Sequence, residues 1–118
     1  MTALRLPLKS KWFEMTKAGI KSEDYREINE YWIKRLVKYC SNMSHLINQP
    51  YLIQLNRFEV EFKHFDINIM TLGYPKSGDS DRILKLEHKG IEIRTGNPEW
   101  GAEPNKLYFV IKHGRIIA

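Results

Sequence analysis

The segment that decides the fold prediction is residues 19–28, Gly-Ile-Lys-Ser-Glu-Asp-Tyr-Arg-Glu-Ile. In a strand, successive side chains alternate between two faces, and here both faces are polar. One face carries Ser22, Asp24 and Arg26, and the other carries Lys21, Glu23, Tyr25 and Glu27. A strand without an apolar face is typical of a sheet edge, where charges block further pairing, or of the wall of a polar pocket. The residue pattern leaves both interpretations open.

The residues before this segment predict a strand followed by a helix. Residues 4–8 place leucines on one face, and Pro7 restricts this strand to an edge or a strand end. Ser10 is a typical N-cap, and Gly19 is a typical residue after a helix end, so a helix is expected over residues 11–18. Trp12 falls at helical spacing with apolar neighbours, which favours the core over contact with a ligand.

After the polar segment, Asn29 predicts the cap of a second helix over residues 30–39. Its apolar stripe ends at Cys40, which we interpret as a buried structural thiol. Residues 41–57 are rich in Ser, Asn and Gln and predict a loop with a short helix or strand.

The second half of the chain predicts mainly strands. Alternating or β-rich runs cover residues 58–64, 67–72, 82–88, 91–95, 107–112 and 115–117. The two runs on either side of Lys89-Gly90 predict either a hairpin or one long strand bent by a bulge. Two early helices and many later strands predict one α+β domain, residues 1–118, whose sheet closes on itself.

Residues 96–105 interrupt these strands with two prolines and Trp100. An exposed tryptophan is unfavourable unless it packs on something or meets a partner. We expect Trp100 to plug one end of the barrel; the alternative is a lid that stacks on a base.

Composition favours an anionic partner and a cytoplasmic location. The chain has 118 residues and a formal charge of +5, and the excess positive charge lies in the first 40 residues. Lys9 and Lys11 flank a helix start, which favours either an anion contact or a solvated face.

One cysteine excludes an internal disulfide, and no apolar run approaches the ~20 residues of a membrane span.

No metal site or cofactor is expected. The four histidines are scattered without metal-ligand spacing, and no glycine-rich phosphate loop or nucleophile elbow is present. Asp79-Ser80-Asp81 lacks the spacing of an EF-hand calcium loop.

The pattern Gly-x-Lys-x-x-acid-x-Arg, here Gly19, Lys21, Asp24 and Arg26, resembles the signature of ASCH domains. Residues 8–13, Tyr31-Trp32 and residues 96–102 are also similar to ASCH proteins of bacteria and phages, whereas residues 41–57 correspond to an insertion. The resemblance implies a small PUA-like β-barrel of about five to six strands, with two flanking helices near the N-terminus.

This resemblance implies an RNA- or nucleotide-binding module whose polar pocket is formed by the motif. The expected ligand-binding residues are Lys9, Lys11, Lys21, Glu23, Asp24, Tyr25, Arg26 and Trp100. One alternative is a nucleoside-directed hydrolase that uses Lys21, at the pocket mouth, and Asp24. Proteins of the ASCH family that hydrolyse N4-acetylcytidine have a threonine at the position of Asp24. A carboxylate at this position could serve as a base, but it cannot act as the same hydroxyl nucleophile. The other alternative is an adaptor that binds a protein.

Overall fold

The fold is taken from a computed structural model that describes residues 2–73 and 80–117. By their contacts these residues form two compact units: unit 1 holds residues 1–24, 64–90 and 112–118, and unit 2 holds residues 25–63 and 91–111. Asp79, part of the segment considered for calcium, lies outside the described residues. In chain order the elements are β1 (Ala3–Leu8), α1 (Ser10–Lys17), β2 (Glu23–Arg26), α2 (Glu30–Leu36), β3 (Val37–Cys40), α3 (Met43–Asn48), η1 (Pro50–Ile53), β4 (Val60–Phe62), β5 (Ile67–Leu72), η2 (Ser80–Arg82), β6 (Ile83–Thr95), η3 (Pro98–Trp100) and β7 (Leu107–Ile116), where η marks a 3-10 helix.

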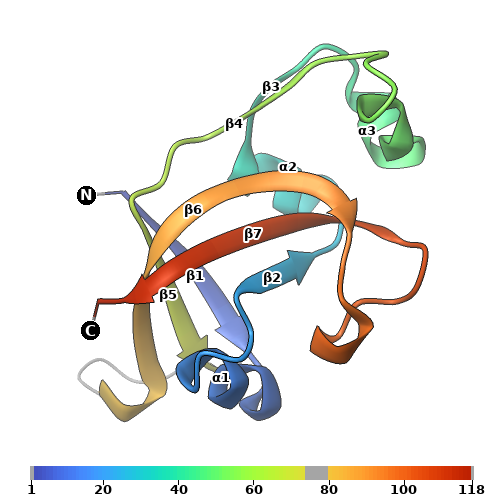
Figure 1. The fold of residues 1–118 in the computed structure, drawn as a ribbon. Helices are drawn as coiled ribbons and strands as arrows, with labels where there is room; N and C mark the ends of the chain where they lie inside the picture. The colour runs from blue at the N-terminus through green and yellow to red at the C-terminus, as the bar shows by residue number, and fades with distance from the viewer. Residues whose placement is uncertain (1, 74–79, 118) are drawn as a thin grey trace. The chain divides into compact units, whose positions relative to one another are not determined.

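Five strands form one sheet in the order β1-β5-β6-β7-β2 (Figure 1). The motif strand β2 is therefore an end strand of the sheet, and its partner in the order is β7. The α+β class and a sheet of the expected strand number are confirmed. The PUA-like barrel stays a prediction.

Unit 1 is built around the parallel pair of β1 and β5, in which Leu6 lies opposite Met70. Leucines of β1 alternate inward, as their period of two predicts, and Leu6, Met70 and Phe13 of α1 are almost completely buried. Burying side chains of this size stabilises the unit by about 1.5 to 3 kcal/mol each. This core fixes the position of α1, whose C-terminal end leads directly to the motif.

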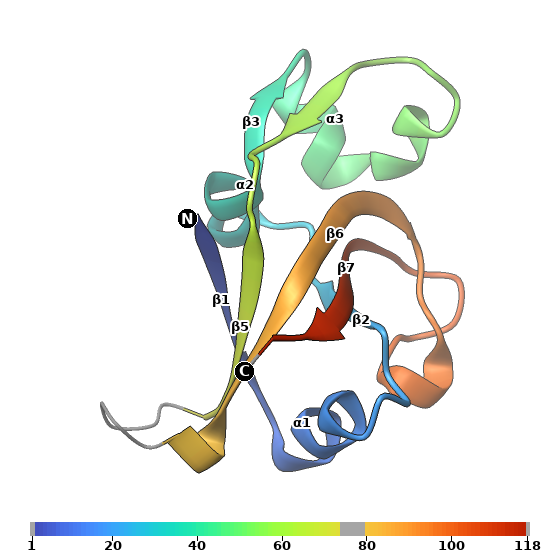
Figure 2. The same ribbon diagram turned by 60° about the vertical axis from the view of Figure 1, so that its left-hand side comes forward.

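Unit 2 contains α2 and a second, two-stranded sheet in which β3 and β4 are antiparallel. The segment between these strands carries α3 and η1 (Figure 2). Leu36 of α2, Leu46 of α3 and Phe109 of β7 are fully buried and supply its core. For residues 41–57 a loop followed by a short helix or strand was expected; the structure has the helix α3, but near the start of the segment, where Leu46 anchors it.

The second helix is shorter than the sequence predicts, because it ends at Leu36 instead of continuing to residue 39. Val37 has an extended backbone (φ −96°, ψ 125°) and pairs with Phe62 of β4. A β-branched residue has a low helix propensity and packs well in a sheet, so tertiary pairing overrides the apolar helical stripe here. Cys40, expected on that stripe, is only half-buried.

The structure corrects two strand predictions and decides between the alternatives of a third. The strand expected at residues 58–64 is limited to β4 and belongs to the small sheet. Residues 82–88 and 91–95 form the single strand β6, which agrees with the prediction of one long strand and not with that of a hairpin. Gly90, within this strand, has a positive φ of 113°. The turn predicted at Gly114 is absent from the continuous strand β7. A Cβ there would lie 2.7 Å from Cε of Lys89, so this glycine permits a close approach of side chains.

Candidate functional site

The end of α1 positions the motif lysine. Gly19 adopts a left-handed backbone (φ 77°), and the N–H groups of Ile20 and Lys21 both donate to the carbonyl oxygen of Met15, at 3.0 and 3.2 Å. This closes the helix and turns the chain toward β2. Lys21 therefore precedes β2, and the alternation of side chains between the two faces of that strand does not apply to it.

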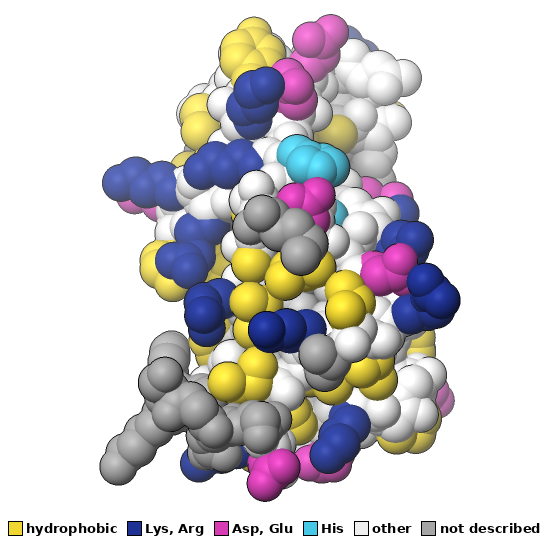
Figure 3. Space-filling view, turned by 90° about the vertical axis from the view of Figure 1, so that its left-hand side faces the viewer, with side chains coloured by type: hydrophobic (Ala, Val, Ile, Leu, Met, Phe, Trp, Pro, Cys, Tyr) yellow, Lys and Arg dark blue, Asp and Glu magenta, His cyan; other side chains and the backbone are white. Residues whose placement is uncertain are grey.

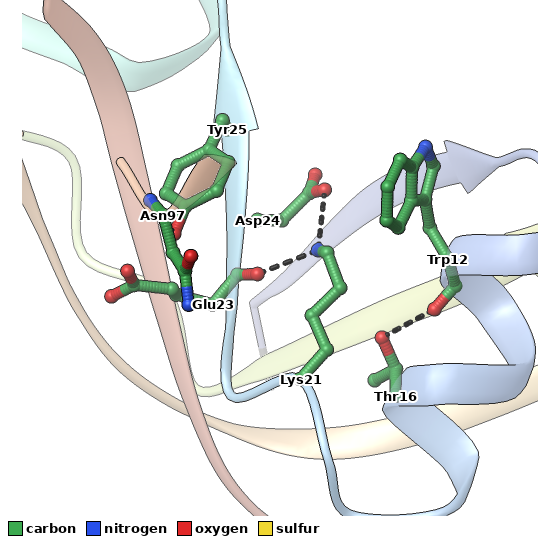
Figure 4. Close-up of polar contacts among 7 residues, drawn as sticks. All are labelled: Trp12, Thr16, Lys21, Glu23, Asp24, Tyr25 and Asn97. Carbon is green, nitrogen blue, oxygen red and sulfur yellow. Dashed lines mark hydrogen bonds and ion pairs between the residues drawn. The ribbon is translucent and has the colours of Figure 1, made fainter. Parts of the chain in front are cut away.

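The Lys21 side chain is buried and lies along β2 (Figure 4). Its Nζ donates to the carbonyl oxygen of Glu23 at 2.6 Å and to Oδ1 of Asp24 at 3.2 Å. The side chains of Lys21 and Asp24 are 1% and 7% exposed. Side-chain alternation placed Lys21 on the face opposite Asp24, and this is wrong, because the residue lies outside the strand and its long side chain reaches back to the carboxylate. Its place at the mouth of a pocket stays a prediction.

His113 of β7 joins this pair in unit 1. Its backbone N–H donates to the carbonyl oxygen of Ser22 at 3.2 Å, and its ring is buried. Within residues 2–73 and 80–117 neither ring nitrogen has a partner at full hydrogen-bond geometry, although a contact with the Lys21 backbone acts to raise the pKa of the ring. Burial, together with the nearby Lys21 charge, lowers the pKa of His113 to about 4, so the ring is neutral at physiological pH. We call Lys21, Asp24 and His113 the buried cluster.

Burial of the cluster carries a cost in stability. Taking two charges out of water costs several kcal/mol per ion, which their attraction and the further hydrogen bond of Lys21 offset. Burying an imidazole whose ring nitrogens lack full hydrogen-bond geometry within the described residues adds to that cost. Groups of ionisable residues in such surroundings concentrate at functional sites. We therefore treat the cluster as the candidate binding site.

Trp12 and the N-terminal lysines of α1 lie in the same unit. The Trp12 indole is half-buried and lies on the side of β2 that carries Asp24 (Figure 4). The Lys11 ammonium lies 4.8 Å from the centroid of the Trp12 ring. Lys9 and Lys11 are exposed. Trp12 is thus only partly in the core, which leaves part of its ring accessible.

Glu23 and Tyr25 have their side chains on the other side of β2 (Figure 4). The Tyr25 hydroxyl accepts from the backbone N–H of Asn97 at 2.8 Å, and its ring lies 5.7 Å from that of Tyr108. Tyr25 also packs on a cluster containing Ala102. The observed role of Tyr25 is therefore to anchor the loop after β6, and its predicted stacking on a ligand stays a prediction.

Two other predicted residues belong to unit 2. The Arg26 guanidinium lies 4.9 Å from the centroid of the Trp32 ring. Trp100 is half-buried in η3, and its role as a plug or a lid stays a prediction.

The structure thus brings together Lys21, Asp24 and the backbone of Glu23, and it adds His113, which sequence reasoning missed. The local pattern gave little signal, because residues 108–111 are all buried, so β7 is buried on both faces there and shows no period of two. The interpretation of His113-Gly114 as a turn placed His113 outside the strand.

Charge alone does not mark the site. On the face shown in Figure 3, Lys and Arg side chains are interspersed with acidic and hydrophobic ones. Among residues 2–73 and 80–117, no group of three or more His, Cys, Asp or Glu residues is arranged to hold a metal ion. None of the helices in these ranges is long and apolar enough to cross a membrane.

No protein-family model, curated protein or solved structure matches this chain.

Proposed function

We propose that this chain is an ASCH-like module that binds a nucleotide, free or within RNA, at the buried cluster of unit 1. The observation that carries the proposal is the buried Lys21–Asp24 ion pair beside the buried imidazole of His113. Lys21 would hold the Asp24 carboxylate in place, and that carboxylate would accept a hydrogen bond from an exocyclic amine of the base.

Trp12 and Lys11 would complete this site. An accessible indole face offers a stacking platform, and every nucleobase has a ring face. Lys11, next to Trp12, supplies the positive charge that a phosphate requires, and Lys9 adds to the local potential. Recognition would thus combine stacking, one charged acceptor for the base edge and electrostatic attraction of the phosphate.

The contacts of Lys21 do not favour the hydrolase alternative. A lysine nucleophile must lose its proton, whereas the carboxylate and carbonyl oxygens around Lys21 stabilise the ammonium form. We therefore expect no hydrolysis of N4-acetylcytidine. Turnover that disappears in Lys21→Ala would overturn this expectation and favour the enzyme.

The test of nucleotide binding is a titration of the full chain with the four ribonucleoside monophosphates, followed by calorimetry at low salt. Asp24→Asn keeps the shape and an acceptor for Lys21 but removes the charge, and it should weaken binding about tenfold or more. Lys11→Gln should weaken it less, and Lys17→Gln, which removes an exposed charge at the other end of α1, should have little effect.

Circular dichroism must show that each variant is folded. Absence of saturable binding for all four nucleotides, or equal affinity in wild type and folded Asp24→Asn, would overturn the proposal. If Lys11→Gln and Lys17→Gln weaken nucleotide binding equally, the binding is nonspecific attraction between charges.

A further inference from the structure

An arginine–aromatic surface lies on α2 and the last residue of β2 in unit 2, and the contacts of the buried cluster do not account for it. We use this name for Arg26, Tyr31, Trp32 and Arg35. The Arg35 guanidinium lies 5.1 Å from the centroid of the Tyr31 ring and 5.8 Å from that of Trp32. The two rings meet edge to face at 5.1 Å and an interplanar angle of 87°. Two guanidinium groups therefore share two adjacent rings.

This surface is open to solvent. Tyr31 is 58% exposed, Arg35 is exposed and Trp32 is half-buried. Within the part of the chain that the structure describes, the Arg35 guanidinium makes these ring contacts and no ion pair with a carboxylate. A stacked guanidinium still directs its N–H groups outward in its own plane, where they can donate to an external anion.

The local charge around the arginine–aromatic surface is positive. Lys34 is exposed on α2 and Lys38 is exposed on β3, whereas Glu30 is the acidic residue of this helix. Glu27, which precedes α2, is bound by Lys106 at 2.7 Å, so that ion pair offsets its charge. Gathering like charges costs electrostatic energy unless an anion compensates it. Charge therefore selects an anionic occupant.

We propose that the arginine–aromatic surface is a binding site for single-stranded nucleic acid, in addition to the nucleotide site of unit 1. Tyr31 and Trp32 would stack on unpaired bases, and Arg35 and Arg26 would contact the phosphates. Bases in a duplex already stack on each other, so exposed rings of this kind favour a single strand over a duplex. An acidic protein surface would also gain from both the charges and the rings, since Arg, Tyr and Trp are enriched in protein interfaces, so saturable binding of an unpaired oligonucleotide that requires Tyr31 is the outcome that selects the single strand.

The experiment measures binding of the full chain to labelled single strands of about ten nucleotides, oligouridylate and oligodeoxythymidylate, by fluorescence anisotropy at low salt. Tyr31→Ala should weaken binding about fivefold or more, because it removes one stacking platform. Arg35→Lys, which keeps the charge but not the planar stack, should weaken it more than Arg57→Lys. Arg57 is the matched control, because it is an exposed arginine of the same unit whose guanidinium contacts no ring in the described part of the chain.

Tryptophan fluorescence supplies a second readout. Because Trp12 belongs to the site proposed in unit 1, this measurement uses a Trp12→Phe background: quenching by the oligonucleotide should be lost when Trp32→Phe is added and retained when Trp100→Phe is added. Unchanged affinity in Tyr31→Ala, equal losses in Arg35→Lys and Arg57→Lys, or preference for a duplex of the same sequence would overturn the proposal. Because Asp24→Asn tests mononucleotide binding in unit 1 and Tyr31→Ala tests strand binding in unit 2, failure of one proposal is distinguishable from failure of the other.

Discussion

The buried cluster of unit 1 and the arginine–aromatic surface of unit 2 both contain cationic side chains, but their surroundings give those cations different roles. Lys21 has a side chain 1% exposed and a carboxylate at 3.2 Å, whereas Arg35 is exposed and lies against rings. A buried charge that loses its partner destabilises the fold, while an exposed one interacts weakly with its neighbours and remains available to a ligand. Substitutions in the two regions should therefore separate stability from binding.

The largest effect is expected for Asp24→Ala. This change leaves the buried Lys21 ammonium without its carboxylate, and breaking a buried pair in this way costs about 3 to 5 kcal/mol of unfolding free energy. Urea denaturation at neutral pH measures it. The double variant Lys21→Met/Asp24→Leu removes both charges and should recover most of the loss. If Asp24→Ala lowers the unfolding free energy by less than about 1 kcal/mol, the Lys21–Asp24 pair contributes no more to stability than an exposed ion pair does.

The next effect is pH-dependent and concerns His113. Its folded pKa is about 4, below the ordinary 6.5, because of burial and the charge of Lys21. Between these values the unfolded chain binds a proton that the folded chain does not, so stability falls as the pH drops from 6.5 to 4. The shift corresponds to a loss of about 3 kcal/mol by pH 4.

The neutral variant His113→Gln isolates this contribution from that of the carboxylates, which also titrate in acid. The stability of wild type minus that of His113→Gln should decrease from pH 7 to pH 4.5 in urea melts. A difference that is constant with pH would contradict the assigned environment of His113.

A smaller effect is expected where Tyr25 anchors its loop. Tyr25→Phe leaves the Asn97 N–H without its acceptor and should cost about 1 kcal/mol of stability. Tyr39→Phe is the control, since Tyr39 is 53% exposed and should change nothing measurable. Equal stability of Tyr25→Phe and wild type in urea would contradict this anchoring role and would leave only the predicted role of Tyr25 in ligand binding.

The sequence predicted much of the fold because local patterns and tertiary packing agree there. Leu4, Leu6 and Leu8 alternate inward as predicted, and Asn29 caps α2 by accepting from the Trp32 N–H at 3.0 Å. The end of α2 could not be predicted, because pairing with β4 sets the extended conformation of Val37. Such pairing depends on residues far along the chain, which local propensity does not encode.

For the candidate site, the motif named Lys21 and Asp24, which the structure places 3.2 Å apart, but it did not indicate that both side chains are buried. Alternation placed them on opposite faces, and only the helix end at Gly19 explains why Lys21 lies outside the strand. His113 was missed because it is 92 positions from Lys21 in sequence (113 minus 21) and meets it only through folding. Arg26 was assigned to the motif pocket, whereas its ring contact is with Trp32 of the next helix.

The smallest effect is expected for Lys38→Gln, which tests whether every cation near the arginine–aromatic surface matters. Lys38 Nζ lies 3.7 Å from Oε1 of Glu61 on the neighbouring strand β4, and the two side chains are 67% and 62% exposed. An exposed pair at this distance is screened by solvent and salt, so its removal should change stability by less than about 1 kcal/mol. Because Lys38 carries no stacking contact, oligonucleotide affinity should also change less than in Tyr31→Ala, and the difference should shrink as salt is raised. A loss in Lys38→Gln equal to that in Tyr31→Ala, measured by the same anisotropy titration, would show that charge rather than stacking distinguishes this region from the buried cluster.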